Sequence, residues 1–313
     1  PQEVNFPMNR TFPKLFCVGV AMILGLSASA KIELHSLFGD NMILQRDAST
    51  SLWGWVAPGA AVEVKASWGD SAKAKADEDG KWVVLLNTPG LGTGHGLTIS
   101  SGKEVVKIKN VAVGEVWLCA GQSNMGFALG MMFTGEEDAP KAKHPDYRIF
   151  KSSREHWHEP RERSNDRLAK WKPCTPESAA ESSAVSYYFG QKLHLELGIP
   201  VGIIIQAYAG TPIEGWMPKE MQMDDPRAVA VAKDLDEKSN RGGTAVAQRK
   251  AALATHQKEL AAYNARVDAG DIMKNKVRKI GPPFILRPAN MGHQYPANIY
   301  NAMIRPVVPY GIR

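Results

Sequence analysis

A serine at position 123 stands where an apolar segment gives way to a short polar one. The run Val113-Gly114-Glu115-Val116-Trp117-Leu118-Cys119 predicts a buried strand, and Gly121-Gln122-Ser123-Asn124 follows almost at once. A strand that turns sharply into a loop presents a serine hydroxyl as a nucleophile. The well-known G-x-S-x-G elbow needs a second glycine after the serine, and Met125 occupies that place. The segment therefore indicates a serine esterase with a different turn.

The elements after residue 113 predict a parallel sheet between helical layers. Val201-Gly202-Ile203-Ile204-Ile205 is apolar throughout, as expected of a strand covered on both faces. Between the two strands, Ser183 to Leu197 predicts a helix, and Ser178 with Glu181 predicts a capping box ahead of it. The helix is expected to bury one apolar face, formed by Val185, Tyr188, Phe189 and Leu193. Alternating strands and helices of this kind form α/β layers.

The residues before this region have a different pattern. From Lys31 to about Asn110, short β-prone runs such as Ser51 to Val56 alternate with turn residues at close spacing. We therefore predict a β-sandwich over residues 31–111 and a three-layer α/β/α domain over residues 112–313. A helical insertion is expected at about 220–280, with a long helix from Thr244 to Val267 lying on the main domain. The apolar stripe of that helix leaves an oligomer contact open.

The N-terminal residues and the composition bear on location and partners. Met8 to Ala30 has a positive start, an apolar stretch and a small-residue cleavage site, which predicts a signal peptide and a secreted or periplasmic protein. An uncleaved membrane anchor is the alternative. The net charge of +6 is spread along the chain, so we expect no nucleic-acid partner and no membrane association of the mature form. Cys119 is expected to be a core residue.

Four segments of the chain resemble one known family. Residues Val113 to Met125 are similar to the first motif of the sialate O-acetylesterase group of SGNH hydrolases. Leu37 to Arg46 resembles the start of that family's N-terminal β domain, and Gly210-Thr211-Pro212-Ile213-Glu214-Gly215-Trp216 resembles its second active-site block. Ile299 to Pro306 resembles the segment that leads into its third block. The resemblance runs from Leu37 to the last residue and is weakest in the helical insertion.

The resemblance implies an activity and the residues that perform it. Enzymes of this family remove acetyl groups from sugar hydroxyls, and the match makes Ser123 the nucleophile. The backbone amides of Ser123 and Gly210 would form the oxyanion hole. Without the first motif, Gly210 would be read as a turn that caps the second strand. Substrate contacts are expected from four residues: Gln122, Asn124, Glu214 and Trp216. No metal or cofactor is expected.

The chain departs from the family pattern near its end. The family's third block and the block with its catalytic aspartate and histidine would follow Pro306, and the sequence stops at Arg313. We therefore expect a C-terminally truncated chain with little or no esterase turnover. His156, His158 and His293 do not stand in an Asp-x-x-His arrangement, so a surface or substrate-contact role is favoured for each. His156-x-His158 without a third ligand is a weak metal signal.

Three functions remain open on the sequence. The favoured one is an exported carbohydrate O-acetylesterase of the sialate type that acts on an acetylated carbohydrate. An acetylxylan esterase would use the same nucleophile, because the motifs report the reaction and not the sugar. A non-catalytic carbohydrate-binding protein could keep the Ser123 pocket without a triad. The oligomeric state is not predicted.

Overall fold

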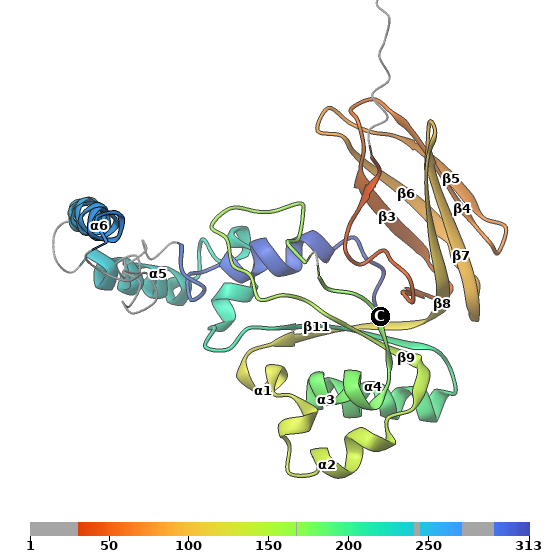
Figure 1. Ribbon diagram of the computed structural model, residues 1–313. Helices are drawn as coiled ribbons and strands as arrows, with labels where there is room; N and C mark the ends of the chain where they lie inside the picture. Colours follow the sequence, from red (N-terminus) through yellow and green to blue (C-terminus); the bar gives the residue numbers. More distant parts are fainter. Residues whose placement is uncertain (1–30, 167, 241–244, 271–290) are drawn as a thin grey trace, which may run out of the picture.

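The computed structural model describes residues 31–166, 168–240, 245–270 and 291–313 (Figure 1). The predicted signal peptide, 8–30, lies outside these residues. The described strands are β1 (Glu33–Leu34), β2 (Ile43–Gln45), β3 (Ser49–Trp55), β4 (Ala61–Ala66), β5 (Ser71–Lys75), β6 (Lys81–Asn87), β7 (Gly92–Ser101), β8 (Glu104–Gly121), β9 (His144–Lys151), β10 (Lys172–Cys174) and β11 (Val201–Ala207).

The described helices include one-turn and long examples. They are α1 (Ser123–Gly126), α2 (Gly135–Asp138), α3 (Pro176–Glu181), α4 (Ala184–Leu197), α5 (Pro226–Asn240) and α6 (Ala245–Asp268). Shorter helical turns are η1 (Leu129–Met131), η2 (Ala139–Lys141), η3 (Ile213–Trp216), η4 (Lys219–Met221), η6 (Tyr300–Ile304) and η7 (Arg305–Val307).

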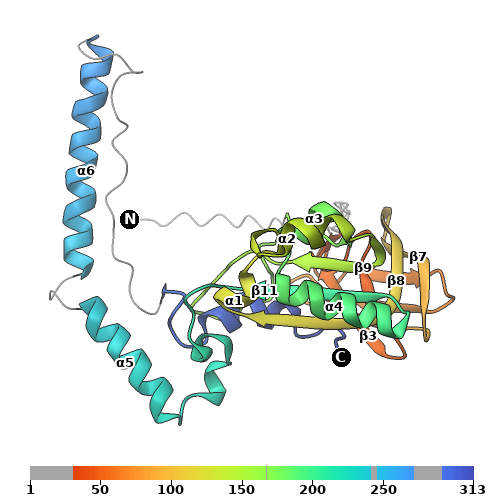
Figure 2. The same cartoon turned by 90° about the horizontal axis from the view of Figure 1, so that it is seen from below.

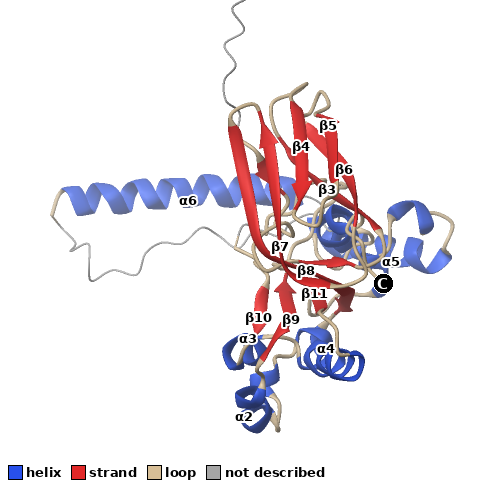
Figure 3. Ribbon diagram, turned by 90° about the vertical axis from the view of Figure 1, so that its right-hand side faces the viewer, coloured by secondary structure: helices blue, strands red, loops and turns tan. Residues whose placement is uncertain are grey.

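Two sheets face each other in the N-terminal part (Figure 3). One has the strand order β1-β3-β6, and the other contains β5, β4, β7 and the first half of β8. Strand β6 shows why they pack: Trp82, Val84 and Leu86 are buried, and the residues between them point outward. Trp53 from one sheet and Val64 from the other belong to the same apolar core.

Strand β8 connects this part to the rest of the molecule. Its residues 104–110 are mostly accessible to solvent and pair with β7, whereas residues 111–116 are all buried. Residues 115–121 pair in parallel with β11, which itself pairs in parallel with β9. The predicted boundary at residue 111 thus falls inside one continuous strand. The mixed α/β fold predicted from the sequence is confirmed, and its parallel strands β8, β11 and β9 carry helices α1 to α4 on one face (Figure 1).

Helix α4 is present as predicted, but its predicted capping box is wrong, and of its predicted buried face only Leu193 packs against the core. Thr175 and Ser178 form a capping box for α3, and Ser183 caps α4 by accepting from the Ser186 amide at 3.1 Å. The face of α4 toward the sheet carries small residues together with Tyr187, while Val185, Tyr188 and Phe189 are at least one-third exposed. A Cβ at Gly190 would lie 2.6 Å from the Tyr147 ring, so close packing on the sheet requires a glycine there.

The predicted insertion contains two helices, α5 and α6. Residues 241–244 and 271–290 of it lie outside the described residues. Helix α6 stands apart from the rest of the chain, so the expectation that it lies on the main domain is wrong (Figure 2). Leu253 and Leu260 remain 37% and 38% exposed, because one apolar residue per two turns makes too narrow a stripe to bury.

Candidate active site

Two turns lie side by side where the parallel strands β8 and β11 end. Gly121 and Ala207 are register partners at the carboxyl ends of these strands. The Tyr208 amide donates to the Gly121 carbonyl at 3.0 Å, which extends the pairing by one residue. Open α/β sheets place their ligands at this edge. The sheet therefore brings the turn that carries Ser123 next to the turn that carries Gly210.

The side chain of Met125, which stands where the G-x-S-x-G elbow has its second glycine, anchors the turn that carries Ser123. Helix α1 begins at Ser123, and the Met125 side chain points toward α4, where the hydroxyls of Ser183 and Ser186 donate to its sulfur at 3.6 and 3.4 Å. Ser123 itself is exposed. Met125 thus anchors the turn while the serine hydroxyl stays accessible.

Three donors meet at one oxygen in this site. The side-chain oxygen Oε1 of Gln122 accepts hydrogen bonds from the Ser123 amide at 2.9 Å and from the Ser123 hydroxyl at 2.8 Å. The Gly210 amide donates to the same oxygen at 3.4 Å. This amide oxygen thus lies between the two backbone amides. The two predicted oxyanion donors therefore converge on one point.

The Gly210 turn owes its shape to a left-handed glycine and a short hydrogen-bond chain. Gly210 has φ 73°, a conformation that favours glycine. The Thr211 hydroxyl donates to the Tyr208 carbonyl at 2.7 Å and accepts from the Trp216 indole at 2.8 Å. The Gln294 side chain donates to the Gly210 carbonyl at 3.1 Å. Side chains on both sides of Gly210 thus fix the direction of its amide.

The remaining predicted contact residues surround this turn in different ways. Trp216 uses its indole N–H within the turn, and the Glu214 carbonyl accepts from the Ala297 amide and the Gln222 side chain, each at 2.9 Å. Asn124 is exposed on α1, one residue after Ser123. The substrate contacts proposed for Asn124, Glu214 and Trp216 stay predictions.

The structure adds a ring cluster beside Gly210. The His293 ring stacks on the Tyr208 ring, with centroids 4.9 Å apart and planes 8° apart, and the Tyr208 hydroxyl lies 3.2 Å from His156 Nδ1. A Cβ at Gly210 would lie 3.8 Å from His293 Nε2. Sequence reasoning missed Tyr208, although it lies directly after the second strand. Among the described residues, the Ser123 hydroxyl bonds to Gln122 and to no histidine.

Comparison with known proteins finds a family match for the segment that carries Ser123 and Gly210. Residues 113–264, which hold both turns, match the family described as "Carbohydrate esterase, sialic acid-specific acetylesterase". This segment of the chain is similar to the sialate O-acetylesterase family. The resemblance of its motifs to this family is thereby confirmed.

Relatives and a solved structure show how far the likeness extends. The sialate O-acetylesterases of Pongo abelii and Homo sapiens are each 29% identical over 212 residues, which is 61% of this chain and 39% of theirs. The chain thus spans about two-fifths of the length of these curated relatives. A crystal structure of a carbohydrate acetylesterase from Xanthomonas citri is 26% identical with a TM-score of 0.64, covering 90% of this chain and 49% of that one.

A cavity of about 510 Å³ opens beside the turn that carries Gly210. One wall is the turn itself, with Gln122, Gly210 and Pro212, and the opposite wall is helix α5. Its volume lies in the range of small-molecule sites. The helical insertion therefore lines a cavity together with Gln122 and Gly210.

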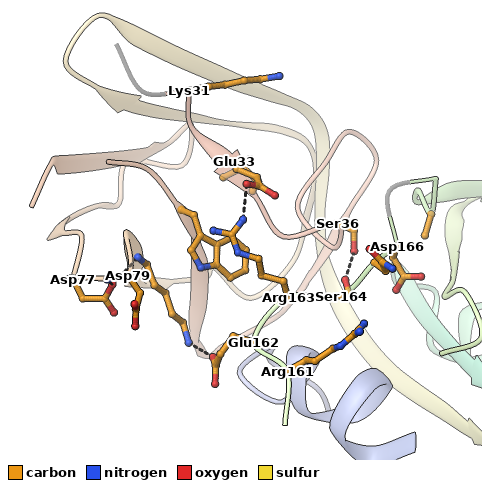
Figure 4. Close-up of a pocket in the computed structure, with 15 residues that line it drawn as sticks. Lys31, Glu33, Ser36, Asp77, Asp79, Arg161, Glu162, Arg163, Ser164 and Asp166 are labelled. Atoms are coloured by element: carbon orange, nitrogen blue, oxygen red, sulfur yellow. Dashed lines mark hydrogen bonds and ion pairs between the residues drawn. The ribbon is translucent and has the colours of Figure 1, made fainter. Parts of the chain in front are cut away.

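A larger cavity of about 1180 Å³ lies between β1, β3 and the loop 161–169 (Figure 4). Four of its charged groups form two ion pairs. Arg163 pairs with Glu33 at 2.6 Å and lies 4.1 Å above the Trp55 ring. Lys81 pairs with Glu162. These pairs join the N-terminal sheets to the loop that leads away from β9.

The described residues include two cysteines outside the site. Cys119 and Cys174 form no disulfide and are buried, as expected for Cys119, and burial raises the pKa of both thiols, that of Cys174 to about 12. Neither is therefore a thiolate nucleophile.

In the described ranges no three His, Cys, Asp or Glu side chains gather as metal ligands. None of the helices within those ranges has the length and apolarity to cross a membrane.

Proposed function

We propose that this protein is an exported carbohydrate O-acetylesterase that uses Ser123 as its nucleophile. The observation that carries the proposal is the single oxygen of Gln122 that accepts from the Ser123 amide, the Ser123 hydroxyl and the Gly210 amide. Acyl transfer requires donors that converge on the carbonyl oxygen and a nucleophilic oxygen next to the carbonyl carbon, and the two amides and the Ser123 oxygen are suited to these roles. The family match supports an acetyl ester on a sugar as the substrate.

The proposed reaction begins when the ester carbonyl oxygen replaces Gln122 Oε1 between the two amides. The Ser123 oxygen then bonds to the carbonyl carbon, and the electron pair of the carbonyl double bond moves onto the oxygen that the amides hold. When the double bond re-forms, the bond to the sugar oxygen breaks and Ser123 is left acetylated. Attack by water on this acetyl-serine releases acetate and restores the hydroxyl.

Protons must move together with these bonds. The proton of the Ser123 hydroxyl leaves as its oxygen attacks, and the departing sugar oxygen gains one proton. In the described residues that hydroxyl donates to Gln122 Oε1, an amide oxygen that is too weak a base to keep the proton. The proposal therefore assigns the nucleophile and two oxyanion donors, and it leaves the base to a group that is not bonded to Ser123 in this arrangement.

The substrate and the location follow from separate observations. The relatives are named for acetyl esters of sialic acid, and the solved structure for carbohydrate esters in general. Acetylated carbohydrate is the class that both share. Export is proposed from the pattern of Met8 to Ala30, and it predicts that the protein recovered outside the cytoplasm starts at Lys31.

Hydrolysis of an acetylated sugar by the protein and by its Ser123→Ala variant tests the proposal. Whatever kcat the protein shows, slow turnover included, we expect the variant to lose at least about a thousandfold of it, because removal of a serine nucleophile removes the covalent route. The exposed Ser71 in β5 gives a matched control, since Ser71→Ala deletes the same hydroxyl far from the site. Acetyl release that is unaffected by Ser123→Ala would contradict Ser123 as the nucleophile. Binding of the sugar with no turnover in any form would favour the non-catalytic binding protein instead.

A further inference from the structure

A segment far along the chain, residues 291–299, lies against the turn that follows β11. The Ala297 amide donates to the Glu214 carbonyl at 2.9 Å, near the end of that turn. At its beginning, the His293 ring stacks on the Tyr208 ring with centroids 4.9 Å apart. The segment thus contacts the turn on both sides of the glycine that lies between these two points.

The supporting segment is itself held in place. Asn298 is buried, its side chain donates to the Gly292 carbonyl at 2.8 Å, and its own carbonyl accepts from the Trp157 amide at 2.9 Å. A Cβ at Gly215 would lie 3.4 Å from the Ile299 side chain, so the segment and the turn are in close contact there. A side chain carried by this segment is therefore well placed to fix the turn.

Gln294 is the side chain that reaches from this segment to Gly210. Its NH₂ group donates to the Gly210 carbonyl at 3.1 Å, and no second donor to that carbonyl lies among the described residues. Gly210 has φ 73° and no side chain, so its two peptide groups rotate more freely than those of other residues. The bond from Gln294 restricts this rotation.

The Gly210 amide depends on such a restriction more than the Ser123 amide does. The Gly210 amide lies 3.4 Å from Gln122 Oε1, which is longer than a usual N–H···O distance, whereas the Ser123 amide lies at 2.9 Å. The Ser123 amide also stands at the start of helix α1. A donor helps an oxyanion only if its direction is set before the charge develops. A small rotation at Gly210 would therefore remove one of the two donors.

The contribution of Gln294 to stability is expected to be small. Gln294 is exposed and lines the cavity beside the turn that carries Gly210. A single hydrogen bond that is open to water adds little to the free energy of unfolding, because water replaces the lost partner. An effect on the reaction can therefore be measured separately from an effect on folding.

We propose that Gln294 is a positioning residue, which holds the Gly210 amide toward the oxygen that becomes negatively charged during acyl transfer. The inference rests on the proposed function, because it takes the Gly210 amide to be an oxyanion donor. It goes further in assigning a role to a residue outside 113–264, the segment that matches the family.

Two substitutions of Gln294 distinguish the donor from the shape of the side chain. Gln294→Met keeps the length and removes the donor, whereas Gln294→Lys keeps a donor. For hydrolysis of an acetylated sugar, Gln294→Met should lower kcat about fivefold to thirtyfold and leave KM within about twofold, because the oxyanion forms only in the transition state. Gln294→Lys should keep kcat within about threefold. Gln257→Met, at an exposed position of α6, is the matched control and should change neither constant.

Backbone NMR relaxation gives a readout that needs no turnover. The order parameter of the Gly210 amide should fall from about 0.85, typical of rigid backbone, to below about 0.6 in Gln294→Met. That of the Ser123 amide should not change, because helix α1 holds it. The urea midpoint of unfolding should equal that of the parent protein, which separates a local effect on the turn from a general loosening of the fold.

The outcomes keep this inference apart from the proposed function. An unchanged order parameter at Gly210, or an unchanged kcat despite a mobile Gly210 amide, would overturn the inference even if Ser123→Ala abolishes hydrolysis. If the parent protein shows no turnover, the rate at which a phosphonate ester labels Ser123 takes the place of kcat. If Ser123 is not labelled, or if hydrolysis persists in Ser123→Ala, the proposed nucleophile is wrong, and the order parameter of Gly210 alone decides whether Gln294 holds the turn.

Discussion

The two main cavities of this protein use their polar groups in opposite ways. In the larger one, beneath the three-stranded sheet, Arg163, Glu33, Lys81 and Glu162 satisfy one another in ion pairs (Figure 4). At the edge of the smaller one, which Gln122 and Gly210 line, the Ser123 hydroxyl and two backbone amides donate to the Gln122 oxygen. Volume alone would have favoured the larger cavity.

This comparison indicates that hydrogen-bond donors converging on one atom identify a functional site better than cavity volume does. Ion pairs that are complete within the protein join two parts of the fold and gain little from a ligand. Amides that converge on a replaceable oxygen gain when negative charge develops there. The larger cavity is therefore interpreted as a structural junction and the smaller one as the place of chemistry.

The largest expected effect that distinguishes them concerns Gly210. Gly210→Ala should lower kcat about tenfold to a hundredfold, because alanine strains φ 73° and turns the amide away from the oxyanion. Gly198→Ala is the matched control: Gly198 has φ 65°, ends α4 and has room for a methyl group. Kinetics and urea unfolding of both variants check this. Equal losses of activity would mean that the Gly210 amide has no special role.

A pH effect of intermediate size belongs to the structural junction. His35 accepts from the Leu37 amide, lies 3.1 Å from the Ser164 hydroxyl, and is buried, which lowers its pKa to about 4. It is neutral in the folded protein, whereas the unfolded chain binds a proton below about pH 6.5. Its contribution to stability is therefore complete above pH 6.5 and is lost as the pH falls toward 4, by about 3 kcal/mol.

The His35 effect is measured by urea unfolding at several pH values. The protein and its His35→Gln variant should differ in the slope of unfolding free energy against pH between pH 6.5 and 4, with the shallower slope in the variant. Parallel curves would show that His35 titrates normally and that the junction is open to water at this point.

The smallest expected effect concerns Arg163. Arg163→Ala removes the pair with Glu33 and the contact over Trp55, and it should lower the unfolding free energy by about 1 kcal/mol because both charged groups are partly exposed. Its kcat and KM should stay within about twofold of the parent values. A large rise in KM with unchanged stability would show that the larger cavity takes part in substrate binding.

Sequence reasoning found the parts of the site that local pattern determines. An apolar strand followed by Gly121 to Asn124 predicted the turn that carries Ser123, and the strand Val201 to Ile205 predicted the neighbouring turn. Both strands formed and paired in parallel, because runs buried on both faces have few other ways to satisfy their backbone. Family resemblance, and not pattern, singled out Gly210.

What the sequence did not predict depends on contacts between distant segments. The apolar face expected on α4 is partly exposed because Gly190 sets the helix close to Tyr147, a contact 43 positions away. The position of the Gln122 oxygen and the α5 wall of the cavity each depend on residues of another element. The local sequence pattern therefore predicts neither of them. Tertiary packing decides such features, and single-sequence periodicity does not contain it.

The central claim is that the Ser123 and Gly210 amides hold the oxygen of a substrate bonded to Ser123. A crystal structure of the protein after reaction with a phosphonate ester tests it most directly. We expect phosphorus bonded to the Ser123 oxygen and a phosphonyl oxygen within hydrogen-bond distance of both amides. The Gln122 side chain should have moved away from its position between the two amides. A phosphonyl oxygen that faces solvent while Gln122 still binds both amides, or a phosphonate on a different residue, would contradict it.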